Sequence, residues 1–200
     1  MFAFLRKSSG QPRKILILLG HPDKETTCGH LADSYETGAR QAGHEVRRIN
    51  IGELTFDPIL HKGYKTVQEL EPDLVMVQEA FKWAGHVVIL YPNWWSSMPA
   101  LLKGMFDRMF LPGFAYNFHQ FGWDKLLKGK TGRVIITMDN WPLLARVMFG
   151  DYTNEITNAI LGFSGIKPVH IWKVGPLKHM NEIEKNDCID KAFALGGQAF

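Results

Sequence analysis

Two consecutive tryptophans stand in a short segment between an aliphatic run and a proline. The segment reads Tyr91-Pro92-Asn93-Trp94-Trp95-Ser96-Ser97-Met98-Pro99. Exposed tryptophan rings are unfavourable in water unless they cover something flat and apolar, and the main-chain N–H groups of such a turn can hydrogen-bond the polar edge of a heterocycle. The alternative is that the rings pack beneath the following helix, which is more readily expected of one ring than of both. The segment therefore predicts contact with a planar ligand.

A second segment, from His21 to Gly29, has the features of an anion site. It matches neither the G-x-G-x-x-G pattern of dinucleotide-binding Rossmann folds nor the G-x-x-x-x-G-K-[ST] pattern of P-loop NTPases, so both are disfavoured. Thr26 and Thr27 stand where a helical pattern begins, and the N–H groups and partial positive charge of a helix N-terminus attract phosphate. The alternative is that one of these threonines simply caps the helix.

A third segment again combines polar residues with an aromatic ring, in Thr137-Met138-Asp139-Asn140-Trp141. The stretch from Phe114 to His119 supplies further flat side chains. Aromatic segments beside one anion site describe a receptor for a planar ring that carries phosphate, and a flavin nucleotide is the natural candidate. Paired carboxylates, a serine nucleophile elbow and metal-ligand spacing are missing from these segments, so we expect no metal site.

Each of these segments follows a run with the length and composition of a strand. The expected strands cover residues 14–20, 44–50, 86–91, 133–137 and 169–174. Continuous aliphatic runs are typical of parallel strands that are buried on both faces. Five strands that alternate with helices predict an α/β fold, a three-layer sandwich around a five-stranded parallel sheet. Ligands of such sheets bind outside the carboxyl ends of the strands, where the three segments lie.

Helical spacing separates the expected strands. The expected helices cover residues 31–42, 73–84, 99–110, 152–162 and 181 to about 195. Gly43 is placed to end the first helix, and Asn181 with Glu184 has the spacing of a capping box at the start of the last. The segments 51–72 and 114–123 are expected to be irregular.

Composition narrows the possible classes of protein. The chain has 200 residues, of which 46% are hydrophobic, and a net charge of +3 with scattered basic residues. This predicts a single domain at 14–200 after a flexible leader at 1–13, and gives no electrostatic footprint for nucleic acid. The longest apolar runs are too short to span a bilayer. Cys28 and Cys188 are too few and too far apart for a disulfide framework, which fits the cytoplasm.

Several motifs occur together in the order and spacing of one enzyme family. They are Tyr91-Pro92 through Trp95, Met98-Pro99-Ala100-Leu101-Leu102-Lys103-Gly104, Gly113-Phe114-Ala115-Tyr116 and Thr137-Met138-Asp139. With these motifs the chain, from residue 14 nearly to its end, resembles the flavodoxin-like NAD(P)H:quinone oxidoreductases, the family of DT-diaphorase and the modulators of drug activity.

The resemblance implies a flavin-dependent enzyme that takes hydride from NAD(P)H and passes two electrons to a quinone or a similar small acceptor. It implies FAD as the cofactor, with FMN as the alternative. By position, the flavin phosphate would contact His21, Thr26 and Cys28. The isoalloxazine ring would contact Pro92, Asn93, Trp94, Trp95, Thr137, Met138 and Asp139. Tyr116 would act as the catalytic residue that closes the substrate face, from the partner subunit.

The stretch 111–123 predicts a homodimer. It carries more aromatic side chains than one small domain usually leaves exposed, namely Phe114, Tyr116, Phe118, Phe121 and Trp123. A twofold dimer would bury them and bring Tyr116 over the flavin of the partner. The alternative is that the stretch folds back on its own core.

Three other functions are compatible with the sequence. They are an electron carrier of flavodoxin type, a regulatory flavoprotein subunit of a transporter, and a degenerate fold without flavin. Oxidation of NAD(P)H by the isolated protein would distinguish the enzyme from all three.

Overall fold

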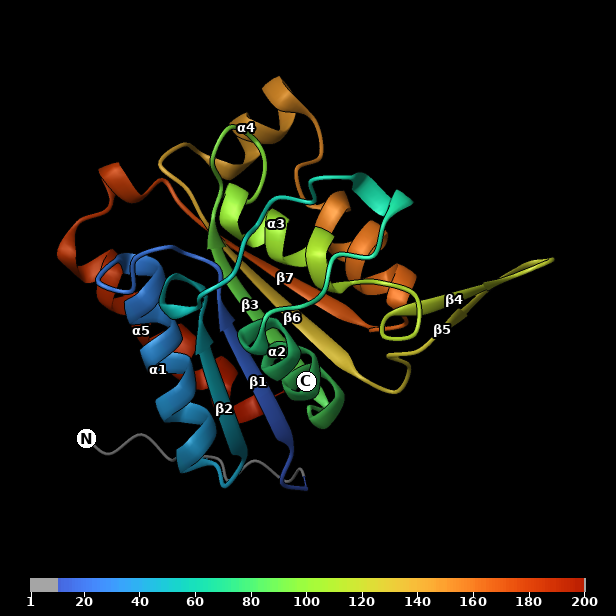
Figure 1. Ribbon diagram of the computed structural model, residues 1–200. Helices are drawn as coiled ribbons and strands as arrows, with labels where there is room; N and C mark the ends of the chain where they lie inside the picture. Colours follow the sequence, from blue (N-terminus) through green and yellow to red (C-terminus); the bar gives the residue numbers. More distant parts are fainter. Residues whose placement is uncertain (1–10, 200) are drawn as a thin grey trace.

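A five-stranded parallel sheet forms the middle layer of the protein (Figure 1). The computed structural model describes residues 11–199, so most of the expected leader at 1–13 lies outside the described residues. The sheet has the order β2-β1-β3-β6-β7, with β1 at Lys14–Leu19, β2 at Glu45–Asn50, β3 at His86–Pro92, β6 at Thr131–Thr137 and β7 at Val169–Val174. The five expected strands and their parallel arrangement are confirmed.

Helices cover both faces of the sheet (Figure 1). One face packs against α1 (Thr27–Gln41) and α5 (Glu182–Gln198), and the other against α2 (Pro72–Trp83), α3 (Ala100–Met109) and a π-helix (Glu155–Gly162). Successive side chains of a strand point to opposite faces, so the aliphatic run of β1 contributes to both cores. Ile15 and Ile17 pack with α1, whereas Leu16 and Leu18 lie in the core beneath α2 and α3. The predicted three-layer sandwich is therefore confirmed.

The expected helix ends are also confirmed. The Thr26 side chain caps α1, and Asn181 and Glu184 form a reciprocal capping box at the start of α5. Gly43 follows Ala42, the C-cap of α1, and has a φ of 86°, a left-handed conformation that glycine adopts without strain. These local signals could be read from the sequence because each acts within one helical turn.

The sequence predicts an irregular segment at 114–123. In the structure this aromatic stretch is largely an antiparallel ribbon. Strands β4 (Tyr116–His119) and β5 (Gly122–Lys125) form this ribbon, which extends away from the sheet in Figure 1. Aromatic and polar residues alternate along β4, but four residues are too few for a clear period. Phe114 does fold back on the core, where its ring packs against Phe110 with centroids 5.5 Å apart.

Two further elements differ from the expectation. Residues 142–149, for which the sequence predicts neither a helix nor a strand, form α4 (Pro142–Phe149). Leu143, Leu144, Val147 and Met148 of this helix have helical spacing, but their side chains are exposed and only Ala145 is buried. The helix expected at 152–162 is the π-helix Glu155–Gly162. Segment 51–72 holds short 3₁₀ turns at Ile51–Glu53 and Gly63–Lys65, and another lies at Leu177–His179. Among residues 11–199, no helix has the length and apolar character needed to cross a bilayer.

A buried arginine fixes the long segment between β2 and α2. The Arg108 guanidinium, on α3, donates to both carboxylate oxygens of Glu71, at 3.1 and 2.9 Å, and to the Glu69 carbonyl at 2.8 Å. It also donates to the carbonyl of Asp57. Gly104 permits the close approach, because a Cβ there would lie 2.5 Å from atoms of Pro58. The segment is thereby held against α3.

A buried histidine lies at the opposite end of the sheet from the carboxyl edge. Hydrogen bonds join the His86 ring to the Tyr35 hydroxyl at 3.3 Å and to the Thr131 hydroxyl at 2.7 Å. Burial, together with the positive charges of Arg133 and Arg13 and the nearby His170 and His44, lowers the pKa of His86 to about 3. His86 is therefore neutral in the folded protein at neutral pH.

The buried His86 should make the protein sensitive to acid. The unfolded chain, in which the histidine pKa is about 6.5, binds this proton more readily than the folded chain. The stabilising contribution is complete above pH 6.5 and is lost as the pH falls toward 3, by about 1.4 kcal/mol per pH unit. Urea unfolding between pH 7.5 and 4.5 should show this loss in the wild type and a flatter profile in His86→Gln. The exposed His179→Gln is the control, and equal slopes in all three proteins would contradict the prediction.

Candidate functional site

The three polar segments predicted from the sequence meet at the carboxyl edge of the sheet and line one cavity of about 260 Å³. We call this cavity the edge pocket. Its lining residues are His21, Thr26, Thr27, Cys28, Pro92, Asn93, Trp94, Thr137, Met138, Asp139, Asn140 and Leu177. The set includes every cofactor-binding residue expected from the sequence except Trp95. Leu177 was missed because it lies in a turn without any motif.

Main-chain hydrogen bonds fix the loops around the edge pocket. The Asn93 N–H donates to the Thr137 carbonyl at 2.7 Å, directly beyond the β3–β6 pairing. The Met138 N–H donates to the Val174 carbonyl at 2.9 Å, and the Leu177 N–H donates back to the Met138 carbonyl at 3.0 Å. The parallel ladder thus continues from the strands into the loops. The pocket walls are positioned by the sheet itself.

The N-terminus of α1 forms one end of the edge pocket. The Thr26 hydroxyl accepts a hydrogen bond from the Gly29 N–H at 3.3 Å, so the capping role is present. The first N–H groups of a helix have no acceptor within the helix, and Thr27 and Cys28 of this first turn line the pocket. Gly29 is needed here because a Cβ would lie 1.8 Å from the Lys24 carbonyl oxygen. The terminus can therefore both be capped by Thr26 and face an anion.

The Cys28 thiol in the edge pocket is buried and protonated. Burial, opposed by a hydrogen bond with Thr137, raises the pKa of Cys28 to about 12. A neutral thiol is a poor nucleophile. We therefore assign Cys28 a packing role at the helix terminus and no thiolate chemistry.

The tryptophan segment forms a tight turn with an unusual backbone. Trp94 and Ser97 exchange main-chain hydrogen bonds of 2.9 and 3.0 Å, and the two residues between them, Trp95 and Ser96, have φ angles of 52° and 60°. This is the conformation of a type I′ turn, which asparagine and glycine favour. A bulky residue in the left-handed region is strained, and such residues cluster at functional sites.

Neither tryptophan packs beneath the following helix. Trp94 lines the edge pocket, and its ring meets His21 edge-on with centroids 5.4 Å apart. Trp95 is fully exposed at the tip of the turn and contributes nothing to the pocket of its own chain. The two rings therefore have different surroundings, and only Trp94 is placed to contact a ligand in this pocket.

Tyr116 lies in a different cavity, of about 310 Å³, which we call the aromatic pocket. Its lining residues are Tyr64, Lys103, Phe106, Asp107, Phe110, Tyr116, Phe118, Glu155, Ala159, Ile160, Phe163 and Ser164. Phe163 and Glu155 were missed in the sequence because they flank a π-helix and join the others only through the fold. Tyr116 does not line the edge pocket of its own chain, so a role there requires a partner subunit.

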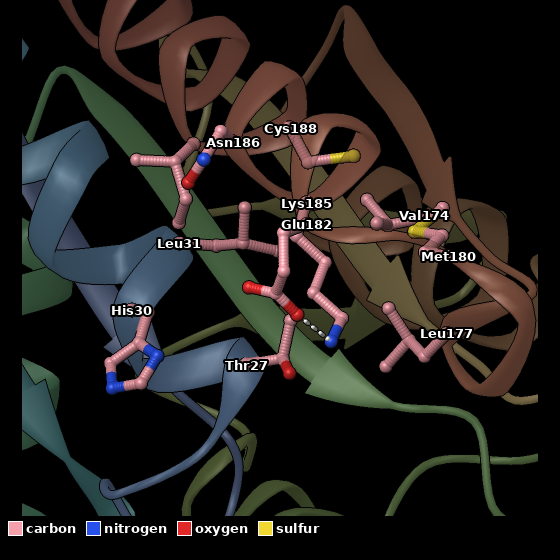
Figure 2. Close-up of a pocket in the computed structure, with 11 residues that line it drawn as sticks. Thr27, His30, Leu31, Val174, Leu177, Met180, Glu182, Lys185, Asn186 and Cys188 are labelled. Atoms are coloured by element: carbon pink, nitrogen blue, oxygen red, sulfur yellow. Dashed lines mark hydrogen bonds and ion pairs between the residues drawn. The ribbon is translucent and has the colours of Figure 1, made fainter.

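A third cavity, of about 170 Å³, adjoins the edge pocket and shares Thr27 and Leu177 with it (Figure 2). Figure 2 shows Glu182 and Lys185 of α5 pointing toward each other, with an ion pair of 2.7 Å between them. Among residues 11–199, no three His, Cys, Asp or Glu side chains gather in a way that could hold a metal ion.

Comparison with known protein families identifies the fold of the chain. A family model for the flavodoxin-like fold matches residues 13–194. The chain belongs to this flavodoxin-like family. The match includes all three segments of the edge pocket and the whole parallel sheet, as the sequence resemblance implied.

Relatives within and near the flavodoxin-like family include oxidoreductases. An uncharacterized NAD(P)H oxidoreductase of Haemophilus influenzae is 30% identical over 127 residues, which cover 62% of this chain and 63% of the relative. An FMN-dependent NADH:quinone oxidoreductase of Macrococcus caseolyticus is 25% identical over 209 residues, covering 92% and 98%. The chain spans less than two thirds of several other curated relatives that it matches.

A solved structure from Streptococcus mutans UA159 shares this architecture. It is 26% identical, with a TM-score of 0.80, over 92% of this chain and 98% of that protein. The flavodoxin-like architecture of the chain is therefore found in an experimental structure of almost the same extent.

The Thr26 cap gives a first test of the anion-binding end. Thr26→Val removes the acceptor for the Gly29 N–H, so the free energy of unfolding should fall by about 1 kcal/mol, whereas Thr26→Ser should retain most of it. Urea unfolding measures this difference. Titration of each folded apoprotein with FMN then separates the two roles. Equal FMN affinity in the wild type, Thr26→Val and Thr26→Ser would limit Thr26 to capping. Unchanged stability of Thr26→Val would contradict the capping role.

Proposed function

We propose that the protein is a flavin-dependent NAD(P)H oxidoreductase that passes two electrons to a quinone or a similar planar acceptor. The observation that carries this proposal is the convergence, in one edge pocket, of a helix N-terminus, main-chain groups from three loops, and the ring of Trp94. These are the features that a phosphate-bearing planar ring needs. The names of the Haemophilus and Macrococcus relatives support the same activity.

The residues of the edge pocket fit a flavin in defined roles. The N–H groups at Thr27 and Cys28 would bind the phosphate, and the main chain at Asn93 and Asp139 would hold the polar edge of the ring. When bound, the flavin would supply hydride transfer between NAD(P)H and the acceptor. The protein orients the ring and excludes water from it, and Trp94 provides an apolar wall.

We propose FMN rather than FAD as the cofactor. The Macrococcus relative is named as FMN-dependent and matches nearly the whole chain, which supports the smaller flavin. FAD, the cofactor implied by the sequence resemblance, would have to extend its adenylate beyond the edge pocket. The adjoining cavity could receive it only beside the Glu182–Lys185 pair (Figure 2). Mass analysis of the flavin released from purified protein decides between the two.

We further propose a homodimer in which Tyr116 closes the active site of the partner. Phe118 and Phe121 of the ribbon are 68% and 87% exposed, and Trp95 is fully exposed. A two-stranded ribbon is at best marginally stable alone, and large exposed aromatic groups usually mark an interface. Both features support a second subunit packed against the ribbon.

The free thiols of Cys28 and Cys188 fit a reducing compartment, and we propose the cytoplasm.

The two tryptophans should differ in their effect on flavin binding. Trp94→Ala removes a wall of the edge pocket and should weaken flavin affinity by tenfold or more, since truncation of an aromatic anchor commonly costs about 2 kcal/mol. Trp95→Ala is the matched control and should leave affinity almost unchanged. Flavin fluorescence titration of the apoproteins measures both. Unchanged affinity in a folded Trp94→Ala protein would remove that ring from the site.

The shared site predicts rescue between two inactive chains. Trp94→Ala lacks a good flavin pocket and Tyr116→Ala lacks the covering tyrosine, so each homodimer should oxidise NAD(P)H slowly. An equal mixture that exchanges subunits forms heterodimers with one intact site, and should regain about a quarter of the wild-type rate. A mixture that never exceeds the mean of its two components would place Tyr116 and the flavin in the same chain. A colourless protein that neither binds flavin nor oxidises NAD(P)H would overturn the function itself.

A further inference from the structure

Several aromatic rings form one wall of the aromatic pocket. The Tyr116 ring packs edge-on against Phe118 and Phe163, with centroids 4.9 and 5.2 Å apart. Phe163 in turn stacks on Trp123 at 4.7 Å, and the Trp123 indole N–H donates to the Phe163 carbonyl at 3.0 Å. Phe106 is buried on the α3 side of the pocket. Such walls suit a flat aromatic guest.

The charged side chains of the aromatic pocket do not cancel. The Lys103 ammonium lies 2.7 and 2.9 Å from the two carboxylate oxygens of Asp107, so this pair is neutral as a whole. Glu155, also on the pocket wall, belongs to none of the ion pairs formed among residues 11–199. Lys103 contributes one positive charge and the two carboxylates contribute two negative charges. The pocket therefore carries a net charge of about −1.

The titration of neighbouring groups agrees with this surplus of negative charge. Burial opposes the charged form of Lys103, yet its hydrogen bond to Asp107 and the charges of Asp107 and Glu155 raise its pKa. Burial and the charge of Asp107 raise the pKa of the Tyr64 hydroxyl, which therefore stays neutral. The cationic and neutral forms of these groups are favoured, as expected beside uncompensated carboxylate charge.

Glu155 also connects the aromatic pocket to the edge pocket. Its carboxylate accepts a hydrogen bond from the Ser97 hydroxyl at 3.1 Å. Ser97 closes the turn whose Trp94 lines the edge pocket. The charge of Glu155 thus lies beside the turn that carries Trp94 of the edge pocket.

We propose that Glu155 selects the charge of the electron acceptor, so that the aromatic pocket takes planar neutral or cationic acceptors in preference to anionic ones with the same ring. The inference rests on the proposed function for its catalytic meaning, but the charge preference of the pocket stands on its own residues. Aromatic faces attract cations and a carboxylate repels anions, so both parts of the pocket favour the same class.

The experiment compares acceptors that differ in charge. The holoenzyme reduces 1,4-naphthoquinone and its 2-sulfonate, and the ratio of their kcat/KM values is taken for each variant, so that differences in intrinsic reactivity cancel. Glu155→Gln should raise the relative kcat/KM of the sulfonate by about fivefold at low salt. The increase should shrink in 0.5 M salt. Lys103→Met should shift the ratio in the opposite direction, because it leaves the carboxylates unopposed.

Ser97→Ala is the matched control for a purely structural role of Glu155. Glu155→Gln removes the charge and keeps a hydrogen-bond acceptor, whereas Ser97→Ala removes the hydrogen bond and keeps the charge. Ser97→Ala should leave the acceptor ratio unchanged. A change in Ser97→Ala equal to that in Glu155→Gln would overturn the proposal, since the turn and not the charge would then set the preference.

A binding measurement separates this inference from the proposed function. Equilibrium dialysis of the oxidised holoenzyme with naphthyl-trimethylammonium and with naphthalene-2-sulfonate needs no turnover. Tighter binding of the cation, with the difference reduced in Glu155→Gln, supports the charge preference whether or not the quinones are reduced. A failure to reduce either quinone would overturn the oxidoreductase function alone. Equal binding, tighter binding of the sulfonate, or no binding of either probe would overturn the proposal while leaving the reductase activity to its own test.

Discussion

The hydrogen bond from the Asn93 N–H to the Thr137 carbonyl carries the sheet one step past its strands, and the candidate site depends on that continuation. The same extension occurs at Met138, which donates to Val174 of the neighbouring strand. Because the ladder hydrogen bonds include the first residue of each loop, the positions at which the loops leave the sheet are fixed. The edge pocket is therefore as rigid at its base as the sheet, although its rim is made of turns and side chains.

Arg108 of α3 provides a comparable constraint on the segment between β2 and α2. Its guanidinium binds Glu71 and two main-chain carbonyls from residues distant in sequence, so the segment after β2 lies against α3. That segment carries Tyr64 to the aromatic pocket. Removal of either partner of a buried ion pair leaves an uncompensated charge, typically at a cost of about 3–5 kcal/mol. The placement of Tyr64 in the aromatic pocket thus depends on a buried arginine, whereas the base of the edge pocket is held by main-chain hydrogen bonds.

The sequence predicts the sheet, most helices and nearly all of the edge pocket because these follow from local or topological rules. Aliphatic runs mark buried parallel strands, and the carboxyl ends of parallel strands share an edge, so residues as distant as Thr26 and Thr137 could be placed together. The aromatic pocket could not be predicted in the same way. Glu155 and Phe163 come together with Tyr116 through tertiary packing at the two ends of a π-helix, and no local pattern links them to Tyr116.

Other details were beyond the sequence for local reasons. The ribbon strands have four residues each, which is too short for alternation to be distinguished from chance. The left-handed backbone of Trp95 contradicts the preference of its residue type, so a rule based on that preference predicts the wrong turn. The sequence could locate this turn next to a ligand, but not its conformation or the separate surroundings of Trp94 and Trp95.

The reliance of the edge pocket on main-chain groups has a consequence for how the protein can diverge. Side chains can be exchanged by mutation, but the N–H groups at the start of α1 and in the loops after β3 and β6 are present with almost any sequence that folds into this sheet. Binding of the proposed flavin through these groups would therefore be inherited with the fold. In our proposal the choice of reaction partner depends instead on side chains outside the ladder, such as Glu155. If the proposed activity holds, a lineage built on this chain could change its electron acceptor while keeping the groups that bind the flavin.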